Sequence, residues 1–164
     1  MFRATLIGIF TLLLINPGFS AEPASRSSQQ PHTFFGIKGG FMKPDGKDND
    51  SAFNIGAVVG QPVSRYFSWE AELNTTLADG EVGTNTNWDI TNIAGYAVYR
   101  SPGNIGFKAK AGLGYWDTDN DSGTSLSMGI GAGIKLGQGG MLDVEYTQVD
   151  DFVDYISVAY LFNF

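Results

Sequence analysis

The sequence predicts an all-β fold, an eight-stranded antiparallel up-and-down transmembrane β-barrel. Three observations support this prediction. Residues alternate with a period of two along eight segments, long and short connections alternate between those segments, and one face of each segment is apolar and free of charge along its centre. A period of two is the pattern of a β-strand, whose successive side chains point to opposite faces of the sheet.

The first residues have the features of a secretory signal peptide. Arg3 supplies a positive charge, residues 4–15 form an apolar run, and small residues follow at Ser20 and Ala21. We expect residues 1–21 to be a signal peptide cleaved after one of these two residues, residues 22–32 to be a flexible leader, and residues 33–164 to form the barrel. The alternative is that the apolar run is retained as an N-terminal anchor.

The composition excludes several classes of protein. Loss of Arg3 with the signal peptide takes the formal net charge from −7 to −8, and a chain this acidic is a poor ligand for nucleic-acid phosphates. The sequence contains no cysteine, so no disulfide is possible, and no apolar stretch after residue 21 approaches the roughly 20 residues of a spanning helix. The high glycine and aromatic content suits a tightly filled barrel.

The first three expected strands cover residues 33–42, 52–60 and 67–77. Their apolar faces consist of Phe35, Ile37 and Phe41, then Phe53, Ile55, Ala57 and Val59, then Phe67, Trp69, Ala71, Leu73 and Leu77. The opposite faces carry small or polar residues, with Lys38, Glu70 and Glu72 as the charged ones.

The fourth expected strand, residues 88–99, is ambiguous because apolar residues fall on both faces. We assign its outer, apolar face to Trp88, Ile90, Ala94, Tyr96 and Val98. This register directs Asp89, Gly95 and Ala97 inward and leaves Ile93 and Tyr99 as exceptions.

The last four expected strands cover residues 105–116, 124–136, 141–148 and 153–164. Lys108, Lys110, Lys135, Asp143 and Glu145 lie opposite an apolar face that includes Leu113, Ile130, Val144 and Val158. The connections 43–51, 78–87 and 117–123 are long and acidic, whereas 62–66, 100–104 and 137–140 are short and rich in Pro or Gly.

The residues of the polar face indicate whether this face lines the interior of the barrel or its outer surface. They are mostly Gly, Ser, Ala, Thr and Asn, which suit the narrow interior of an eight-stranded barrel. Aromatic residues gather near the ends of the apolar face, as in the girdles of bilayer-spanning barrels; they are Phe35, Phe41, Phe67, Trp69, Trp88, Tyr115, Tyr146, Tyr160, Phe162 and Phe164. The alternative is a secreted soluble barrel, which would point its polar face to water.

The signal peptide, the eight strands, the stretch GYAVYRSPGNIGFKAKAGLGYWD at residues 95–117 and the terminal YLFNF together resemble the small eight-stranded outer-membrane barrels of Gram-negative bacteria, the OmpA-like and OmpX-like porin-family group. The resemblance implies residence in the outer membrane, a periplasmic leader and periplasmic termini, outward loops, and contact with lipids and lipopolysaccharide. It also implies assembly through periplasmic chaperones and the barrel-assembly machinery, which reads a terminal aromatic strand, here Tyr160, Phe162 and Phe164. A monomer without cofactor or nucleic-acid partner is expected.

The inward charges predict a network that fills the lumen, because confined charges are costly unless they are paired. Its expected members are Lys38, Glu70, Glu72, Lys108, Lys110, Lys135, Asp143 and Glu145. We expect Lys135 to lie opposite Asp143, and Glu70 and Glu72 to reach Lys108 or Lys110 across the fourth strand. The predicted function is structural, in envelope integrity or surface interaction; the alternatives are a small gated pore and an adhesin acting through the acidic loops.

Two other kinds of site are weakly indicated. The chain has a single histidine, His32, in the leader, so we expect no enzyme of the kind that pairs a histidine base with a nucleophile. Asp117, Asp119 and Asp121 alternate like the ligands of a calcium loop, but the glycine comes one place late and no glutamate closes the site. They are a weak candidate for a metal site.

Overall fold

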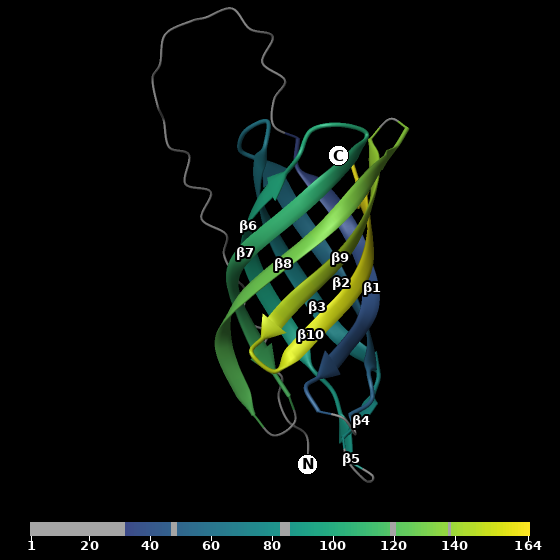
Figure 1. Ribbon diagram of the computed structural model, residues 1–164, viewed down its shortest axis with the longest axis vertical. Coiled ribbons are helices and arrows are strands. Elements are labelled where there is room, and N and C mark those ends of the chain that lie inside the picture. Colours follow the sequence, from purple (N-terminus) through teal and green to yellow (C-terminus); the bar gives the residue numbers. More distant parts are fainter. Residues whose placement is uncertain (1–31, 47–48, 83–85, 119–120, 138) are drawn as a thin grey trace, which may run out of the picture.

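The computed structural model describes residues 32–46, 49–82, 86–118, 121–137 and 139–164 and contains a closed antiparallel β-barrel (Figure 1). The barrel strands in this described part are β1 (Phe34–Pro44), β2 (Ala52–Pro62), β3 (Phe67–Ala78), β6 (Thr91–Arg100), β7 (Ile105–Asp117), β8 (Ser122–Leu136), β9 (Gly140–Asp150) and β10 (Val153–Phe162). Each strand pairs with the next one along the chain, and β1 pairs with β10. The predicted fold class is confirmed.

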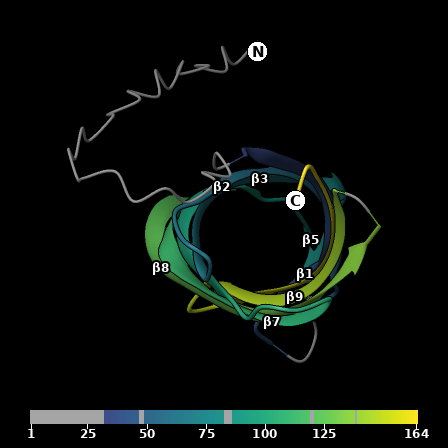
Figure 2. The same ribbon diagram turned by 90° about the horizontal axis from the view of Figure 1, so that it is seen from above.

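Seen from above, the strands form a closed ring (Figure 2), and each is hydrogen-bonded to its two neighbours. The pairing of β1 with β10 runs from Phe35 opposite Phe162 to Pro44 opposite Val153. A closed ladder of this kind satisfies the backbone groups that hydrocarbon cannot hydrogen-bond. Among the described residues there is no helix that is long and apolar enough to cross a membrane.

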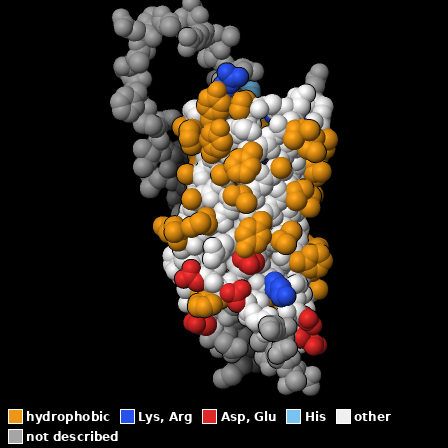
Figure 3. All heavy atoms as spheres, in the orientation of Figure 1, with side chains coloured by type: hydrophobic (Ala, Val, Ile, Leu, Met, Phe, Trp, Pro, Cys, Tyr) orange, Lys and Arg blue, Asp and Glu red, His pale blue; other side chains and the backbone are white. Residues whose placement is uncertain are grey.

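The outer wall of the barrel is apolar. Side chains such as Ile37, Leu73, Leu113 and Ile130 are half exposed or more on the outside, and apolar side chains cover much of the wall in Figure 3. The residues between them point inward and are buried. The alternation predicted for seven of the strands therefore has the predicted orientation, with the apolar face outside.

The two ends of the barrel differ. The connections β2–β3, β6–β7 and β8–β9 are short and lie at the end where β1 begins and β10 finishes, which is the upper end in Figure 1. We call it the short-turn end, and the opposite end the long-loop end. Gly137 and Gly139, in the β8–β9 turn, have φ values of 63° and 89°, which is the left-handed region that glycine adopts without strain.

The connection between β3 and β6 contains two short strands that the sequence pattern does not predict. We predicted residues 78–87 as a loop, but β4 (Gly80–Val82) and β5 (Thr86–Trp88) form a separate two-stranded hairpin, which projects from the long-loop end (Figure 1). Trp88 belongs to this hairpin, where its Nε1 donates a hydrogen bond of 3.1 Å to the backbone oxygen of Asp50. Its predicted place on a barrel strand is wrong.

The predicted register of the fourth barrel strand is also wrong. On β6, Ala94, Tyr96 and Val98 point inward and are at most 4% exposed, whereas Ile93 and Tyr99 point outward and are 49% and 37% exposed. Gly95 and Ala97 consequently face outward, and Asp89 precedes the strand. Alternation could not decide this register because both faces carry apolar residues; the interior contacts described next do.

Candidate functional site

The middle of the lumen holds a network of buried charges. In the described part of the chain it consists of four carboxylates and four cations, each with a side chain no more than 10% exposed: Glu70, Glu72, Asp143, Glu145, Lys38, Arg100, Lys108 and Lys110. They come from β1, β3, β6, β7 and β9. Their formal charges cancel.

The half of the network nearer the long-loop end consists of two lysines that share two carboxylates. Lys38 Nζ lies 2.7 Å from Glu72 Oε2 and 2.6 Å from Glu145 Oε1. Lys110 Nζ lies 2.7 Å from Glu72 Oε1 and 2.6 Å from the same oxygen of Glu145. The hydroxyl of Thr147 donates a further hydrogen bond of 2.9 Å to that oxygen.

The half nearer the short-turn end is centred on Glu70. This carboxylate lies 2.8 Å from Arg100 Nη2 and 2.8 Å from Lys108 Nζ. Arg100 Nη2 also lies 2.8 Å from Asp143 Oδ2. Lys108 contacts Glu145 Oε2 at 2.7 Å, and this pair joins the two halves.

Two tyrosine rings complete the packing around the lysines. Lys110 Nζ lies 4.1 Å from the centre of the Tyr96 ring, and Lys38 Nζ lies 5.2 Å from that of Tyr155. A cation over an aromatic face is attracted by the ring's negative charge density. The Tyr96 hydroxyl lies 3.0 Å from Ser127 Oγ. Burial of this many charges is tolerated only because each one meets opposite charge at hydrogen-bond distance.

Apolar clusters lie in the lumen on both sides of the network. Toward the long-loop end, Met42, Ile90, Val149 and Tyr155 pack together with Trp88, Trp116 and Val153. Toward the short-turn end, Phe34, Val58, Met141, Ala159 and Leu161 pack together with Phe164. The lumen is thus occupied in three layers, with an ionic layer between two apolar ones.

The structure brings together the predicted charges with one exception. The expected contacts across β6 are present, since Glu70 pairs with Lys108 and Glu72 with Lys110. The expected position of Lys135 is wrong: it lies opposite Met141, and Gly133 lies opposite Asp143. The turn is centred nearer β8 than we predicted, and Lys135 therefore lies exposed at the rim of the barrel.

Arg100 belongs to the network, although the sequence pattern predicts it in the turn at residues 100–104. It is the last residue of β6 and points inward with Tyr96 and Val98. A signal was available: with Ile93 and Tyr99 outside, the same alternation directs Arg100 inward, where it supplies the fourth cation and balances the signs.

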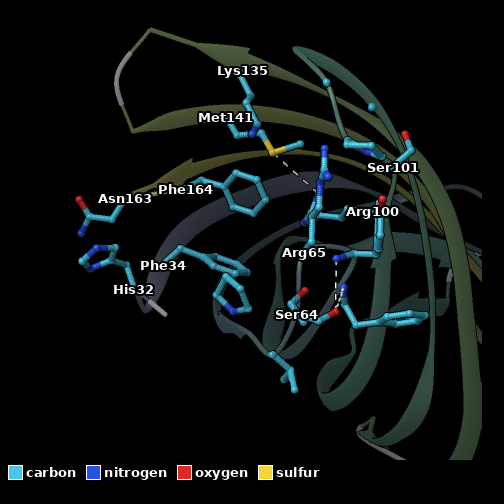
Figure 4. A pocket seen from close by; sticks show the side chains of 18 of the residues that line it. His32, Phe34, Ser64, Arg65, Arg100, Ser101, Lys135, Met141, Asn163 and Phe164 are labelled. Carbon is cyan, nitrogen blue, oxygen red and sulfur yellow. Dashed lines mark hydrogen bonds between the residues drawn. The ribbon is translucent and has the colours of Figure 1, made fainter. Parts of the chain in front are cut away.

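The end of β10 also departs from the prediction. Tyr160 and Phe162 lie together on the outside, with ring centres 4.7 Å apart. Asn163 then has a φ of 59°, which breaks the alternation. Phe164, predicted to face lipid, instead packs its ring edge-on against Phe34, with centres 5.1 Å apart, at the mouth of the lumen (Figure 4).

The candidate metal ligands are only partly described. Asp117 and Asp121 are exposed at the β7–β8 connection, and Asp119 lies outside the described residues, as does the predicted signal peptide. Among the residues that are described, no group of three or more His, Asp or Glu side chains is placed to hold a metal ion.

Comparisons with known proteins give one family. The model of the outer membrane protein beta-barrel domain matches residues 11–159. No curated protein matches the chain.

Several solved structures are similar in fold. The Neisserial surface protein A (NspA) has a TM-score of 0.60 and 12% identity, over 80% of this chain and 97% of that one. The N-terminal β-barrel domain of Pseudomonas aeruginosa OprF has a TM-score of 0.56 and 11% identity, over 82% and 100%. The outer membrane enzyme PagL has a TM-score of 0.53 and 16% identity, over 80% and 99%. At these identities the likeness establishes the fold alone.

Proposed function

Because this chain belongs to the outer membrane β-barrel family, we propose that it is a non-conducting barrel that presents its loops at the cell surface and serves envelope integrity or surface interaction. The family places the barrel in the outer membrane. The role of its lumen and loops is the part that we propose.

The charge-balanced network in the lumen is the observation that carries this proposal. An eight-stranded barrel has an interior that side chains just fill, whereas barrels of sixteen or more strands leave an aqueous channel. In this chain the cross-section is crossed by ion pairs of 2.6–2.7 Å that link β1, β3, β7 and β9. Apolar clusters lie above and below them. An ion entering this lumen would have to displace both kinds of layer.

The proposed orientation follows from the lengths of the connections. Bacterial barrels have short periplasmic turns and longer extracellular loops, so the long-loop end is assigned to the cell exterior. That end carries exposed acids, including Asp45, Asp117 and Asp151, and acidic side chains gather toward it in Figure 3. These loops are the surface through which an adhesin function would act.

Single-channel recording in planar lipid bilayers tests the closed lumen. We expect the wild-type protein to insert without large steady currents. Glu145→Ala removes the carboxylate shared by Lys38, Lys108 and Lys110 and is expected to give intermittent current. Lys43→Ala, at an exposed site near the long-loop end, is the matched control and is expected to stay silent. Steady conductance by the wild type would rule out the closed lumen.

A small gated pore is the second candidate, and one contact favours it. Lys108 lies within reach of three carboxylates, at 2.8 Å from Glu70, 2.7 Å from Glu145 and 3.6 Å from Asp143. A lysine with several carboxylates in reach can move from one to another while its charge stays paired. If the wild type conducts and Glu70→Ala or Lys108→Ala abolishes the closed state, the network acts as a gate.

Phenotypes of a deletion strain separate the two structural roles. An increase in envelope permeability with normal whole-cell adhesion supports envelope integrity, whereas the reverse pattern supports adhesion through the loops. We propose no catalytic activity. PagL shows that this fold can carry an enzyme, but His32, the one histidine of this sequence, lies outside the barrel strands and is exposed at the short-turn end.

A further inference from the structure

The short-turn end of the barrel opens into a cavity that the lumen network does not explain. The cavity has a volume of about 1110 Å³ and is lined by the β2–β3 and β6–β7 turns, the rim of β8 and β9, and the last residues of the chain (Figure 4). Phe34 and Phe164 line its inner side, and Arg100, a member of the lumen network, also borders it.

The charged side chains that line this cavity among the described residues are all cationic. Arg65, Arg100 and Lys135 line it, and no Asp or Glu side chain does so among the described residues. Arg100 is neutralised from below by Glu70 and Asp143. Arg65 and Lys135 are exposed and form no ion pair with any other residue that the structure describes. The rim therefore carries two cationic side chains without a side-chain counter-ion among the described residues.

The cationic groups are placed around an aromatic surface. The ring centre of Phe164 lies 4.9 Å from Arg100 Cζ and 5.8 Å from Lys135 Nζ. On the other side of the cavity, Arg65 Cζ lies 5.6 Å from the ring centre of Tyr66. Figure 4 shows Lys135, Met141 and Phe164 facing Arg65 and Ser64 across the opening. Arginine and lysine held on aromatic rings lose less freedom when an anion binds between them.

Two hydroxyl groups add uncharged donors to the same cavity. Ser64 Oγ accepts the backbone N–H groups of Tyr66 and Phe67, at 3.3 Å and 3.1 Å. Ser101 Oγ accepts that of Phe107 at 2.7 Å. Because each oxygen is used as an acceptor, its own proton is left to donate. The lining thus offers cations and hydroxyl donors, and no Asp or Glu side chain of the described residues competes with a ligand there.

We propose that this cavity binds a phosphate group, through Arg65 and Lys135, with the hydroxyls of Ser64 and Ser101 as additional donors. Phosphate oxygens accept several charge-assisted hydrogen bonds at once, which this set of donors can supply. The phosphate belongs either to a soluble compound entering from the short-turn side or to a lipid headgroup of the adjoining leaflet. The site is independent of the proposed function, since Arg65, Lys135 and the two serines lie at the rim and are not members of the lumen network.

Titration calorimetry on the refolded protein in zwitterionic micelles tests the site. Inorganic pyrophosphate and a short-chain phosphatidic acid are the two titrants, and sodium chloride at matched ionic strength is the reference. We expect saturable binding that the double variant Arg65→Ala/Lys135→Ala weakens at least about tenfold, since charge-assisted hydrogen bonds are lost. Lys43→Ala, which removes an exposed lysine at the opposite end, is expected to leave the affinity unchanged.

A second variant guards against a folding defect. Arg65→Lys/Lys135→Arg keeps both charges and is expected to keep binding within a few-fold, and gel migration before and after heating confirms that each variant is folded. Tighter binding of phosphatidic acid identifies a lipid site, and equal or tighter binding of pyrophosphate identifies a soluble ligand. Absence of saturable binding by both titrants, or equal loss in the double variant and in Lys43→Ala, would overturn the proposal.

Discussion

Lys110 and Glu72 form an ion pair of 2.7 Å although they belong to β7 and β3, which are separated in the barrel by β6. Lys38 on β1 likewise reaches Glu72 past β2. The hydrogen-bond ladder joins only neighbouring strands, so the network adds links between strands that the ladder leaves unconnected.

We expect Glu72→Ala to lower the free energy of unfolding by about 3 kcal/mol, because it removes one of the two carboxylates that compensate Lys38 and Lys110. The double variant Glu72→Leu/Lys110→Leu is expected to lose less stability than the sum of the losses in Glu72→Leu and Lys110→Leu, since it buries no unpaired charge from this pair. Urea unfolding in lipid vesicles measures these values. Exposed Lys43→Ala is the control; strict additivity would show that the pair is not coupled.

Gly112 on β7 and Gly95 on β6 are neighbouring glycines on adjacent strands, one residue out of register. A Cβ at Gly112 would overlap the backbone oxygen of Gly95, whereas a Cβ at Gly95 would meet nothing within 4 Å. We therefore expect Gly112→Ala to destabilise the barrel by about 1–3 kcal/mol through overpacking, and Gly95→Ala to be neutral. The same unfolding assay compares them, and an equal effect of both variants would contradict the close approach of β6 and β7 at this point.

The register of β6 is tested by cysteine labelling, because the natural chain contains no cysteine. Ile93→Cys lies on the outer wall and Ala94→Cys in the filled lumen, since the native residues are 49% and 4% exposed. In micelles, a lipophilic maleimide is expected to react at position 93 at least about tenfold faster than at position 94, because a buried thiol has no access to the reagent. The opposite ratio would restore the register that we first predicted from the sequence.

The sequence was sufficient for most of the barrel because the strands have one face that is clearly apolar. On β9, Val144 and Tyr146 alternate with Asp143 and Glu145, and only one orientation puts the charges inside. β6 lacks this contrast between its two faces. Which of its residues point inward is decided by the ion pairs of Arg100 with Glu70 and Asp143, which lie on other strands. The alternation within β6 alone does not predict contacts with residues so distant in the sequence.

The remaining differences come from turns and chain ends, where backbone conformation decides. The position of the β8–β9 turn moves Lys135 by two residues relative to Asp143. The left-handed Asn163 turns Phe164 away from the outer wall. Neither conformation follows from a period of two. The β4–β5 hairpin is too short for its alternation to be distinguished from a loop.

The orientation of the barrel is tested with cysteines at its two ends. Asp151→Cys lies in the β9–β10 turn at the long-loop end, and Asn104→Cys in the β6–β7 turn at the short-turn end; both native residues are exposed. In intact cells we expect a membrane-impermeant maleimide to label position 151 and not position 104, since the outer membrane shields periplasmic turns. Permeabilised cells should label both, and labelling of position 104 alone in intact cells would reverse the orientation.

Phe164 is predicted to act in two ways that different measurements separate. Its ring packs against Phe34 and lies 4.9 Å from Arg100 Cζ, so Phe164→Ala is expected to lower the stability of the refolded barrel by only about 1 kcal/mol, the usual value of an aromatic pair. If the terminal aromatic strand is also read during insertion, the same variant will reach the outer membrane of cells in much smaller amount.

Phe107→Ala is the control, because this residue is half exposed on the outer wall of β7 and lies outside the terminal strand. A normal membrane level of Phe164→Ala, together with its small loss of stability, would mean that this residue only packs at the mouth of the lumen; a reduced level with Phe107→Ala unaffected would assign it both roles.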